Sequence, residues 1–191
     1  MIVTDLVMMR HAEQVGRPGT HEAELQVELS PRGHEQARLL AERLRRDPPF
    51  DCLASSPFRR ALQTASLLGG EVTILDDLGE LVQPEARDAA RRAVWDRQEF
   101  PPPEAIAAFF ARCTRQLEQL VDRFAGRRIG VVAHAGVVKM LFLHALQIPV
   151  ARCTEIEVKI DHASISHWRH HRRNDRVYWE LVSANDVAHL R

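Results

Sequence analysis

The segment of residues 6–13 constrains the fold most, because an apolar run ends abruptly in two polar side chains. Residues 6–9 read Leu-Val-Met-Met, and Arg10 and His11 follow directly. Four consecutive apolar residues ahead of a polar turn predict a strand that is buried on both faces. Ligands of open parallel sheets bind just beyond the carboxyl ends of such strands. Arg10 and His11 therefore stand where a catalytic pair is expected, although an isolated Arg-His pair also suits an ordinary polar turn.

Strands and helices are expected to alternate along the rest of the chain. Residues 50–54, 72–75 and 129–133 resemble short strands, and helices are predicted after Ser30-Pro31, after Ser56-Pro57, over 84–97, over 106–124 and from His134 to Gln147. Each serine is expected to cap its helix. Residues 156–160 alternate as a strand, and residues 163–168 and 177–182 predict a hairpin around Asn174-Asp175. This order predicts an α/β fold with a largely parallel sheet, in one domain spanning residues 1–191.

Composition excludes several classes of function. The chain has 191 residues, and 26 Lys and Arg balance 26 Asp and Glu, so no overall field attracts nucleic acid or an anionic membrane. The longest apolar stretch is interrupted by charged and histidine side chains, and no signal peptide is recognisable. Cys52, Cys113 and Cys153 lie far apart, without the spacing of a zinc site, as expected for reduced thiols in the cytoplasm.

Basic and titratable side chains recur at the ends of the expected strands. His11 and His134 each end a strand, Arg59 and Arg60 lie in the first turn of the helix after a third, and an acidic loop (residues 76–80) follows a fourth. Guanidinium groups pair with phosphate oxygens, and helix N-termini add N–H groups and a favourable dipole. The pattern predicts an anion site, and it offers neither a metal-ligand cluster nor a Walker-type loop.

Taken together, these motifs resemble those of the histidine phosphatase superfamily, the phosphoglycerate-mutase-like group. The motifs, in the order of that family, are Arg10-His11-Ala12-Glu13, Leu29-Ser30-Pro31-Arg32-Gly33, Ser55-Ser56-Pro57-Phe58-Arg59-Arg60-Ala61, Leu78-Gly79-Glu80, Val131-Val132-Ala133-His134-Ala135-Gly136-Val137 and His162-Ala163-Ser164-Ile165. The resemblance implies a three-layer α/β/α sandwich with a mostly parallel central sheet.

The resemblance also implies a role for each matched residue. His11 is then the nucleophile that becomes phosphohistidine, and Glu80 is the group that protonates the leaving group. Arg10, Arg60 and His134 bind the phosphoryl oxygens, and the match selects Arg60 rather than Arg59. The substrate is a small phosphorylated molecule, and no metal or cofactor is required.

Several positions depart from the family pattern. Ala12 and Ala135 replace glycines, which narrows the approach of the backbone to phosphate but keeps both N–H groups. Gln14 and Arg17 stand where the family often has a Ser or Thr and an Asn. The resemblance therefore does not imply the phosphate contacts that the family makes at these two positions. Arg17 is expected to supply another contact, and it joins Arg10, Arg60, His134 and Ala135 as an expected substrate-binding residue.

Other titratable residues carry alternative interpretations. Asp76 and Asp77 share the loop of Glu80 and are alternatives for the acid. His144 is interpreted as a satisfied core histidine, and the His- and Arg-rich segment 167–173 as a solvated hairpin tip rather than a metal or nucleic-acid site. Three arginines within the helix expected over 84–97 belong either to a solvated face or to a substrate lid: Arg87, Arg91 and Arg92.

The sequence therefore predicts a cytoplasmic, metal-independent phosphomonoester hydrolase. A phosphoglycerate mutase is the first alternative, but mutases of the group carry a longer insertion between the acid and the second histidine than the segment from Glu80 to His134. A catalytically inactive phospho-ligand binding module is the second. Retention of four core residues favours an enzyme: Arg10, His11, Arg60 and His134.

Overall fold

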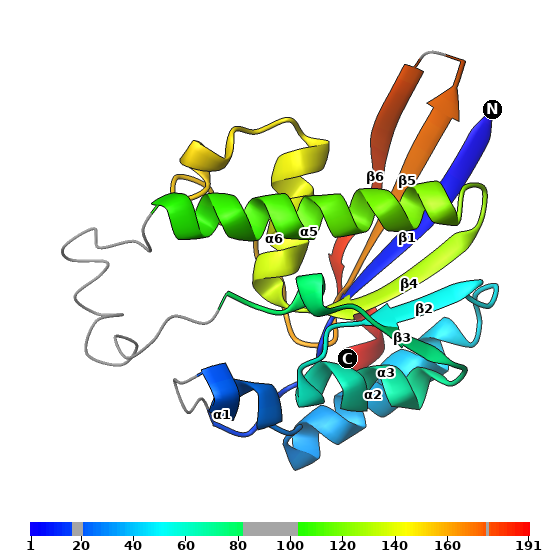
Figure 1. Cartoon of the computed structure of the whole chain (residues 1–191). Coiled ribbons are helices and arrows are strands. Elements are labelled where there is room, and N and C mark those ends of the chain that lie inside the picture. Colours follow the sequence, from blue (N-terminus) through cyan, green and yellow to red (C-terminus); the bar gives the residue numbers. More distant parts are fainter. Residues whose placement is uncertain (17–20, 82–102, 175) are drawn as a thin grey trace.

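A six-stranded sheet forms the centre of the molecule (Figure 1). The computed structural model describes residues 1–16, 21–81, 103–174 and 176–191. The strands follow the spatial order β3-β2-β4-β1-β5-β6. Their bounds are β1 (Ile2–Arg10), β2 (Cys52–Ser55), β3 (Val72–Ile74), β4 (Arg128–Ala133), β5 (Ile165–Arg173) and β6 (Arg176–Asp186). Strands β1 to β4 pair in parallel, whereas β5 pairs antiparallel with β1 and β6, so the predicted mostly parallel sheet is confirmed.

Helices cover both faces of the sheet, which confirms the three-layer architecture (Figure 1). Helices α2 and α3 lie on one face, and α5 and α6 lie on the other. The helix bounds are α1 (His21–Gln26), α2 (Pro31–Leu44), α3 (Arg59–Leu68), α5 (Pro103–Arg123) and α6 (Ala135–Ala145). None of the helices in the described ranges is long and apolar enough to cross a membrane.

The apolar run of β1 is buried on both sides, as predicted. Successive side chains of a strand point to opposite faces. Leu6 and Met8 accordingly join the core cluster of α5 and α6, while Val7 and Met9 join the cluster of α2 and α3. The strand therefore runs through the middle of the protein, and the residues that follow it emerge at the edge where the parallel strands end.

The start of α2 confirms the capping argument and ties this helix to the loop after β1. The hydroxyl of Ser30 accepts a hydrogen bond from the N–H of Gly33 at 2.9 Å. A Cβ on Gly33 would lie only 1.9 Å from the carbonyl oxygen of Glu13. Glu13 is bound further through its side chain, which accepts from the Ser30 hydroxyl at 2.8 Å. This close packing holds the residues just after His11.

The predicted serine cap of α3 and the predicted strand over residues 156–160 are both wrong. Helix α3 begins at Arg59 with Phe58 at the cap position and no capping side chain. The Ser56 hydroxyl instead contacts His134, so a tertiary contact replaces the predicted cap. Residues 156–160 form no strand, although Ile156, Val158 and Ile160 do pack against the core. The hairpin of β5 and β6 is confirmed, and the helix expected over 84–97, with its three arginines, lies outside the described residues.

The His- and Arg-rich segment is not a solvated hairpin tip, because most of it lies inside β5 between two neighbouring strands. His170 and His171 are buried. His167 lies 2.6 Å from Asp5 of β1, and His171 lies 2.7 Å from Glu180 of β6. The carboxylates across the sheet therefore pair with these histidines, and among the described residues no group of three or more His, Cys, Asp or Glu is arranged to hold a metal.

Candidate active site

The site lies at the carboxyl ends of β1 and β4, where His11 and His134 follow their strands directly. The two strands are neighbours in parallel register, with Arg10 opposite Ala133. The N–H of His11 donates to the carbonyl of Ala133 at 2.9 Å, which holds the carboxyl ends of β1 and β4 side by side. The imidazole rings consequently lie 5.1 Å apart, centre to centre. Two histidines separated by more than a hundred residues thus lie together in one buried cluster, as the strand pattern predicts. We call this cluster, with Arg10 and Arg60, the crevice.

The orientation of His11 leaves one ring nitrogen free of a proton. Its Nδ1–H donates to the carbonyl oxygen of Ala12 at 2.8 Å, so in the neutral ring Nε2 carries the lone pair. Nε2 accepts a hydrogen bond from Nε of Arg60 at 3.3 Å. Burial lowers the pKa of His11 well below its usual value, and electrostatic interactions with His134 and with the Arg60 guanidinium lower it further. His11 is therefore a neutral imidazole with a nucleophilic nitrogen facing a guanidinium.

His134 is held between the two sides of the crevice. Its Nε2 lies 2.7 Å from the hydroxyl of Ser56, and its Nδ1 lies 3.5 Å from Nη2 of Arg60. Burial again lowers its pKa most, and the nearby Arg60 and Arg10 lower it further. Ser56, which the sequence suggested only as a helix cap, thus orients the second histidine.

Helix α3 directs one of its two arginines into the crevice. Arg60 is 3% exposed and lies over the ring of Phe58, 4.8 Å from its centre. Arg59 points outward and pairs with Glu28 at the surface. The Arg60 guanidinium also lies 3.3 Å from the carboxylate of Glu24 in α1, a contact that the sequence analysis missed. No local pattern in the sequence signals that contact, because it joins residues of two separate helices.

Arg10 reaches the same crevice from the end of β1. Its guanidinium donates to the carbonyl of Ile160 at 2.6 Å and lies 2.8 Å from Nε2 of His162. The His162 ring is 5.5 Å from that of His11, centre to centre. His162 stands at the first position of the late Asn-Ala-Ser motif, and its contact with Arg10 was likewise not anticipated.

Glu80 lies at the N-terminus of α6, next to His134. Its Oε2 accepts from the N–H of Gly136 at 3.0 Å, and its Oε1 accepts from the N–H of Leu81 at 3.0 Å. A Cβ on Gly136 would lie 2.2 Å from Oε1, so the carboxylate occupies the space that glycine leaves. Asp77 turns away and pairs with Arg115 of α5, and Asp76 is exposed.

An arginine of α5 holds the loop that carries Glu80. Arg112 donates to the carbonyl of Gly79 at 2.6 Å and also to the carbonyl of Asp77. Its guanidinium lies over the ring of Phe109, 4.7 Å from the centre. The position of Glu80 therefore depends on a contact between α5 and the loop after β3.

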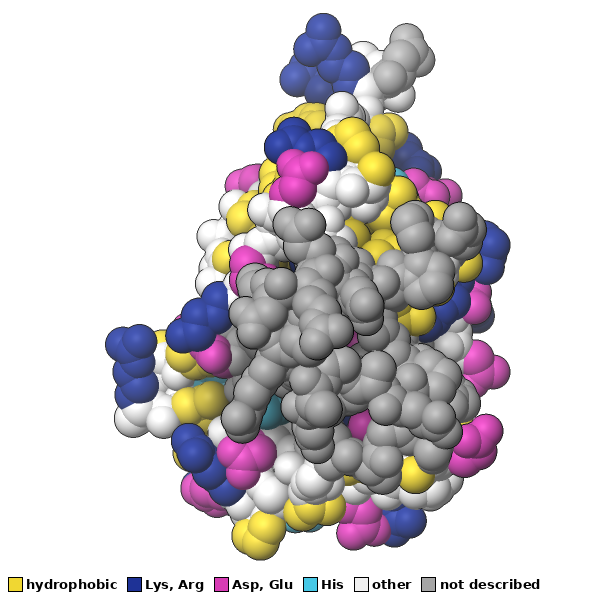
Figure 2. All heavy atoms as spheres, turned by 90° about the vertical axis from the view of Figure 1, so that its left-hand side faces the viewer, with side chains coloured by type: hydrophobic (Ala, Val, Ile, Leu, Met, Phe, Trp, Pro, Cys, Tyr) yellow, Lys and Arg dark blue, Asp and Glu magenta, His cyan; other side chains and the backbone are white. Residues whose placement is uncertain are grey.

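Two expected substrate-binding positions remain. Ala135 is the first residue of α6, so its N–H belongs to the helix start, where N–H groups are available to an anion. Arg17 lies outside the described residues. Figure 2 views the molecule from the side of α1, and acidic, basic and histidine side chains all appear on this face.

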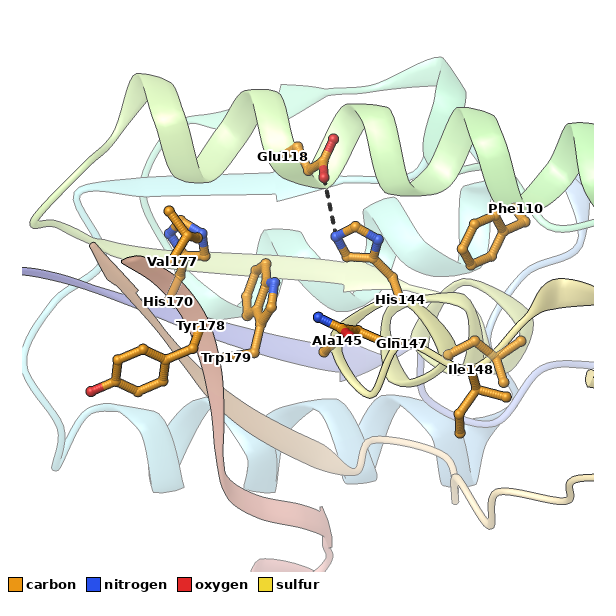
Figure 3. Close-up of a pocket in the computed structure, with 11 residues that line it drawn as sticks. Phe110, Glu118, His144, Ala145, Gln147, Ile148, His170, Val177, Tyr178 and Trp179 are labelled. Carbon is orange, nitrogen blue, oxygen red and sulfur yellow. Dashed lines mark ion pairs between the residues drawn. The ribbon is translucent and has the colours of Figure 1, made fainter. Parts of the chain in front are cut away.

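A separate hollow at the other end of α6 does not belong to the crevice (Figure 3). It has a volume of about 510 Å³ and is lined by residues of α5, α6 and β6, by Gln147 and Ile148 after α6, and by His170 of β5. His144 lies in it and pairs with Glu118 at 3.1 Å. His144 is thus satisfied, as expected, but it is partly exposed rather than a core residue. No arginine of the described ranges lines this hollow, in contrast to the crevice.

The crevice thus combines an unprotonated imidazole nitrogen, two guanidinium groups, a second histidine and a carboxylate at a helix start. Such a set suits nucleophilic attack on an anionic centre whose charge the arginines neutralise. The carboxylate is available for proton transfer.

Comparison with known proteins agrees with this chemistry. The family model of the histidine phosphatase superfamily (branch 1) matches residues 6–186. Phosphoglycerate mutase-like protein 4 of Arabidopsis thaliana is 30% identical, over 97% of this chain and 86% of its own. A metal-independent phosphoserine phosphatase of the same plant is 27% identical, over 98% of this chain and 84% of its own. The structure of a mycobacterial glucosyl-3-phosphoglycerate phosphatase superposes with a TM-score of 0.74 at 26% identity, covering 96% of this chain and 99% of that one.

Proposed function

We propose, from the premise that the chain belongs to the histidine phosphatase superfamily, that it hydrolyses small phosphomonoesters through a phosphohistidine at His11. The observation that carries the proposal is the His11 ring, whose Nδ1–H is bound by the Ala12 carbonyl while Nε2 faces Arg60. Relatives named as phosphatases of phosphoserine and of glucosyl-3-phosphoglycerate support a small phosphorylated metabolite as substrate.

In the first step the lone pair of His11 Nε2 attacks phosphorus. The N–P bond forms as the bond from phosphorus to the leaving oxygen breaks, and that oxygen takes a proton from Glu80. Arg10, Arg60 and His134 bind the phosphoryl oxygens, with the N–H of Ala135 and the side chain of Arg17 as further ligands. Positioning and charge neutralisation account for most of the rate in such transfers.

In the second step water replaces the leaving group. Glu80, now a carboxylate, takes a proton from the water, whose oxygen attacks phosphorus and releases orthophosphate. The N–P bond breaks and its electron pair returns to Nε2. One carboxyl group thus serves as acid and then as base. Because the arginines provide the positive charge, the reaction requires no metal.

A phosphoglycerate mutase is the second candidate, since one relative is named as mutase-like. A mutase returns the phosphoryl group to another hydroxyl of its substrate and releases little orthophosphate. The short segment between Glu80 and His134 favours hydrolysis. As part of the same proposal we assign the enzyme to the cytoplasm, which its three unpaired thiols support.

The test is a rapid-quench search for phosphoenzyme with a panel of phosphorylated metabolites. We expect a burst of acid-labile phosphoenzyme followed by stoichiometric orthophosphate, both abolished in His11→Ala and retained in His34→Ala, which replaces an exposed histidine. EDTA should leave both unchanged, and vanadate should inhibit competitively. Activity that depends on an added divalent ion, or phosphoenzyme in His11→Ala, would overturn the mechanism. Phosphoenzyme without orthophosphate release would favour the mutase.

A further inference from the structure

Glu24 is a buried carboxylate in direct contact with Arg60. Both residues are 3% exposed. Oε2 of Glu24 lies 3.3 Å from Nη1 of Arg60, and the same nitrogen donates to the main-chain carbonyl of Glu24 at 2.7 Å. The other carboxylate oxygen, Oε1, is buried and has no hydrogen-bond partner within the described ranges. The Glu24 carboxylate, with one of its oxygens unpartnered, therefore lies against the guanidinium that the proposed reaction needs for phosphate.

The carboxylate is not needed to orient Arg60. The Nε of Arg60 is bound to His11, its Nη2 lies against His134, and its Nη1 is already bound to a carbonyl. Burying a charged oxygen without a partner is costly, so the unpartnered Oε1 of Glu24 offsets part of what the ion pair with Arg60 contributes to stability. Such a feature at the centre of a reactive crevice points to a role in binding rather than in folding.

Carboxylate and phosphate compete for the same kind of partner. A guanidinium binds either anion through its N–H groups, and two anions at one guanidinium repel each other. Glu24 belongs to α1, a helix of six residues, which is too short to be stable by itself. Its position depends on tertiary contacts, and the pair with Arg60 is one of them. An arriving phosphate therefore meets the negative carboxylate of Glu24 beside the Arg60 guanidinium.

We propose that Glu24 is a built-in competitor of phosphate at Arg60, which weakens the binding of orthophosphate and thereby promotes product release. This inference rests on the proposed function, because it takes Arg60 as a phosphate ligand. Weaker ground-state binding raises KM but shortens the time for which the product occupies the crevice. A cradle of two arginines without this counter-charge would retain orthophosphate longer.

Calorimetric titration of the whole protein with orthophosphate tests the inference without depending on turnover. Glu24→Gln keeps an oxygen near Nη1 but removes the charge. Glu28→Gln is the matched control, since Glu28 follows α1 closely and pairs with Arg59 at the surface. We expect orthophosphate to bind Glu24→Gln about tenfold more tightly than the wild type, on the scale of one like-charge pair in a partly buried site. Glu28→Gln should bind as the wild type does. Glu24→Ala, which also removes the charge, should bind orthophosphate more tightly as well. If the Gln variant does not fold, the result for Glu24→Ala is the deciding one.

Each outcome separates the two proposals. Unchanged or weaker binding in the Glu24 variants, together with loss of binding in Arg60→Ala, would overturn the inference and leave the proposed function intact. Binding in Arg60→Ala as tight as in the wild type would show that Arg60 is no phosphate ligand, and the proposed site would then be wrong. Tighter binding in the Glu24 variants should be matched by a lower inhibition constant for orthophosphate in turnover assays.

Discussion

Arg59 and Arg60 are adjacent in sequence, but only Arg60 contacts the histidines. Neighbouring helical residues project about 100° apart, so α3 cannot direct both side chains into one crevice. We expect Arg60→Ala to lower kcat/KM by roughly 100-fold or more, the usual effect of removing a donor to the transition state. Arg59→Ala, which breaks a surface pair with Glu28, should change kcat/KM by less than about twofold. Steady-state kinetics on both variants measures this, and similar small losses would place the crevice elsewhere.

Gly136 gives an independent test of the role of Glu80. An added Cβ would lie 2.2 Å from Oε1, and a flexible side chain moves more readily than the backbone, so Gly136→Ala should displace the carboxylate without unfolding the protein. Loss of the proton donor matters most for a poor leaving group. We expect Gly136→Ala and Glu80→Gln to slow phosphoenzyme formation from an alkyl phosphate at least tenfold more than from p-nitrophenyl phosphate.

Single-turnover rates are the appropriate measurement, because steady-state rates also include the step with water. Asp76→Asn and Asp77→Asn serve as controls, since neither carboxylate lies at the N-terminus of α6. Equal slowing with both substrates would exclude Glu80 as the acid, and leaving-group dependence in Asp77→Asn would transfer the role to Asp77.

Sequence reasoning found the residues that stand at the ends of strands and missed those that act through them. His11 and His134 follow from local pattern, because they stand at the ends of apolar strands, whereas the resemblance to the family selects Arg60 rather than Arg59. Glu24, Ser56 and His162 act by contacts with residues that are distant in the chain. Neither periodicity nor capping chemistry encodes such contacts.

At the scale of elements, predictions succeeded where local chemistry determines the structure. The Ser30 cap and Pro31 start α2 as expected, because both act within one turn. Apolar alternation over residues 156–160 indicated a strand, but these side chains pack on the core without pairing to the sheet. For residues 167–173 the charged composition suggested solvent, whereas Asp5 and Glu180 pair with them inside the sheet.

Arg112 makes the position of Glu80 depend on α5. Its two hydrogen bonds to the loop carbonyls would be lost in Arg112→Met, while the packing on Phe109 would largely remain. We expect kcat to fall roughly tenfold with little change in KM, because a misplaced proton donor impairs the transition state more than binding. The loss should be larger for the alkyl phosphate than for p-nitrophenyl phosphate. Arg115→Met, which breaks an exposed pair with Asp77, is the control. A loss confined to KM would show that Arg112 does not act through Glu80.

At the scale of the whole molecule, the buried crevice links catalysis to stability. Burial, more than any neighbouring charge, lowers the pKa values of both His11 and His134 in the folded protein. An unfolded histidine has a pKa of about 6.5. Below that pH the unfolded chain binds protons that the folded protein does not, so the free energy of unfolding falls as the pH decreases. Each such histidine contributes up to about 1.4 kcal/mol per pH unit.

Replacing either histidine should therefore make stability less sensitive to acid. Urea unfolding of the wild type, His11→Gln, His134→Gln and His34→Gln at pH 7.5, 6.5 and 5.5 measures this. His34 is exposed and serves as the matched control. We expect the loss of stability between pH 6.5 and 5.5 to be smaller in His11→Gln and in His134→Gln, by up to about 1 kcal/mol each, because the unfolded histidine is already half protonated at pH 6.5. It should be unchanged in His34→Gln.

The comparison of slopes is independent of any change in absolute stability that the substitutions cause. An acid dependence that is the same in all four proteins would mean that the crevice histidines take up protons in the folded state, and His11 would then lack the unprotonated nitrogen on which the proposed reaction depends.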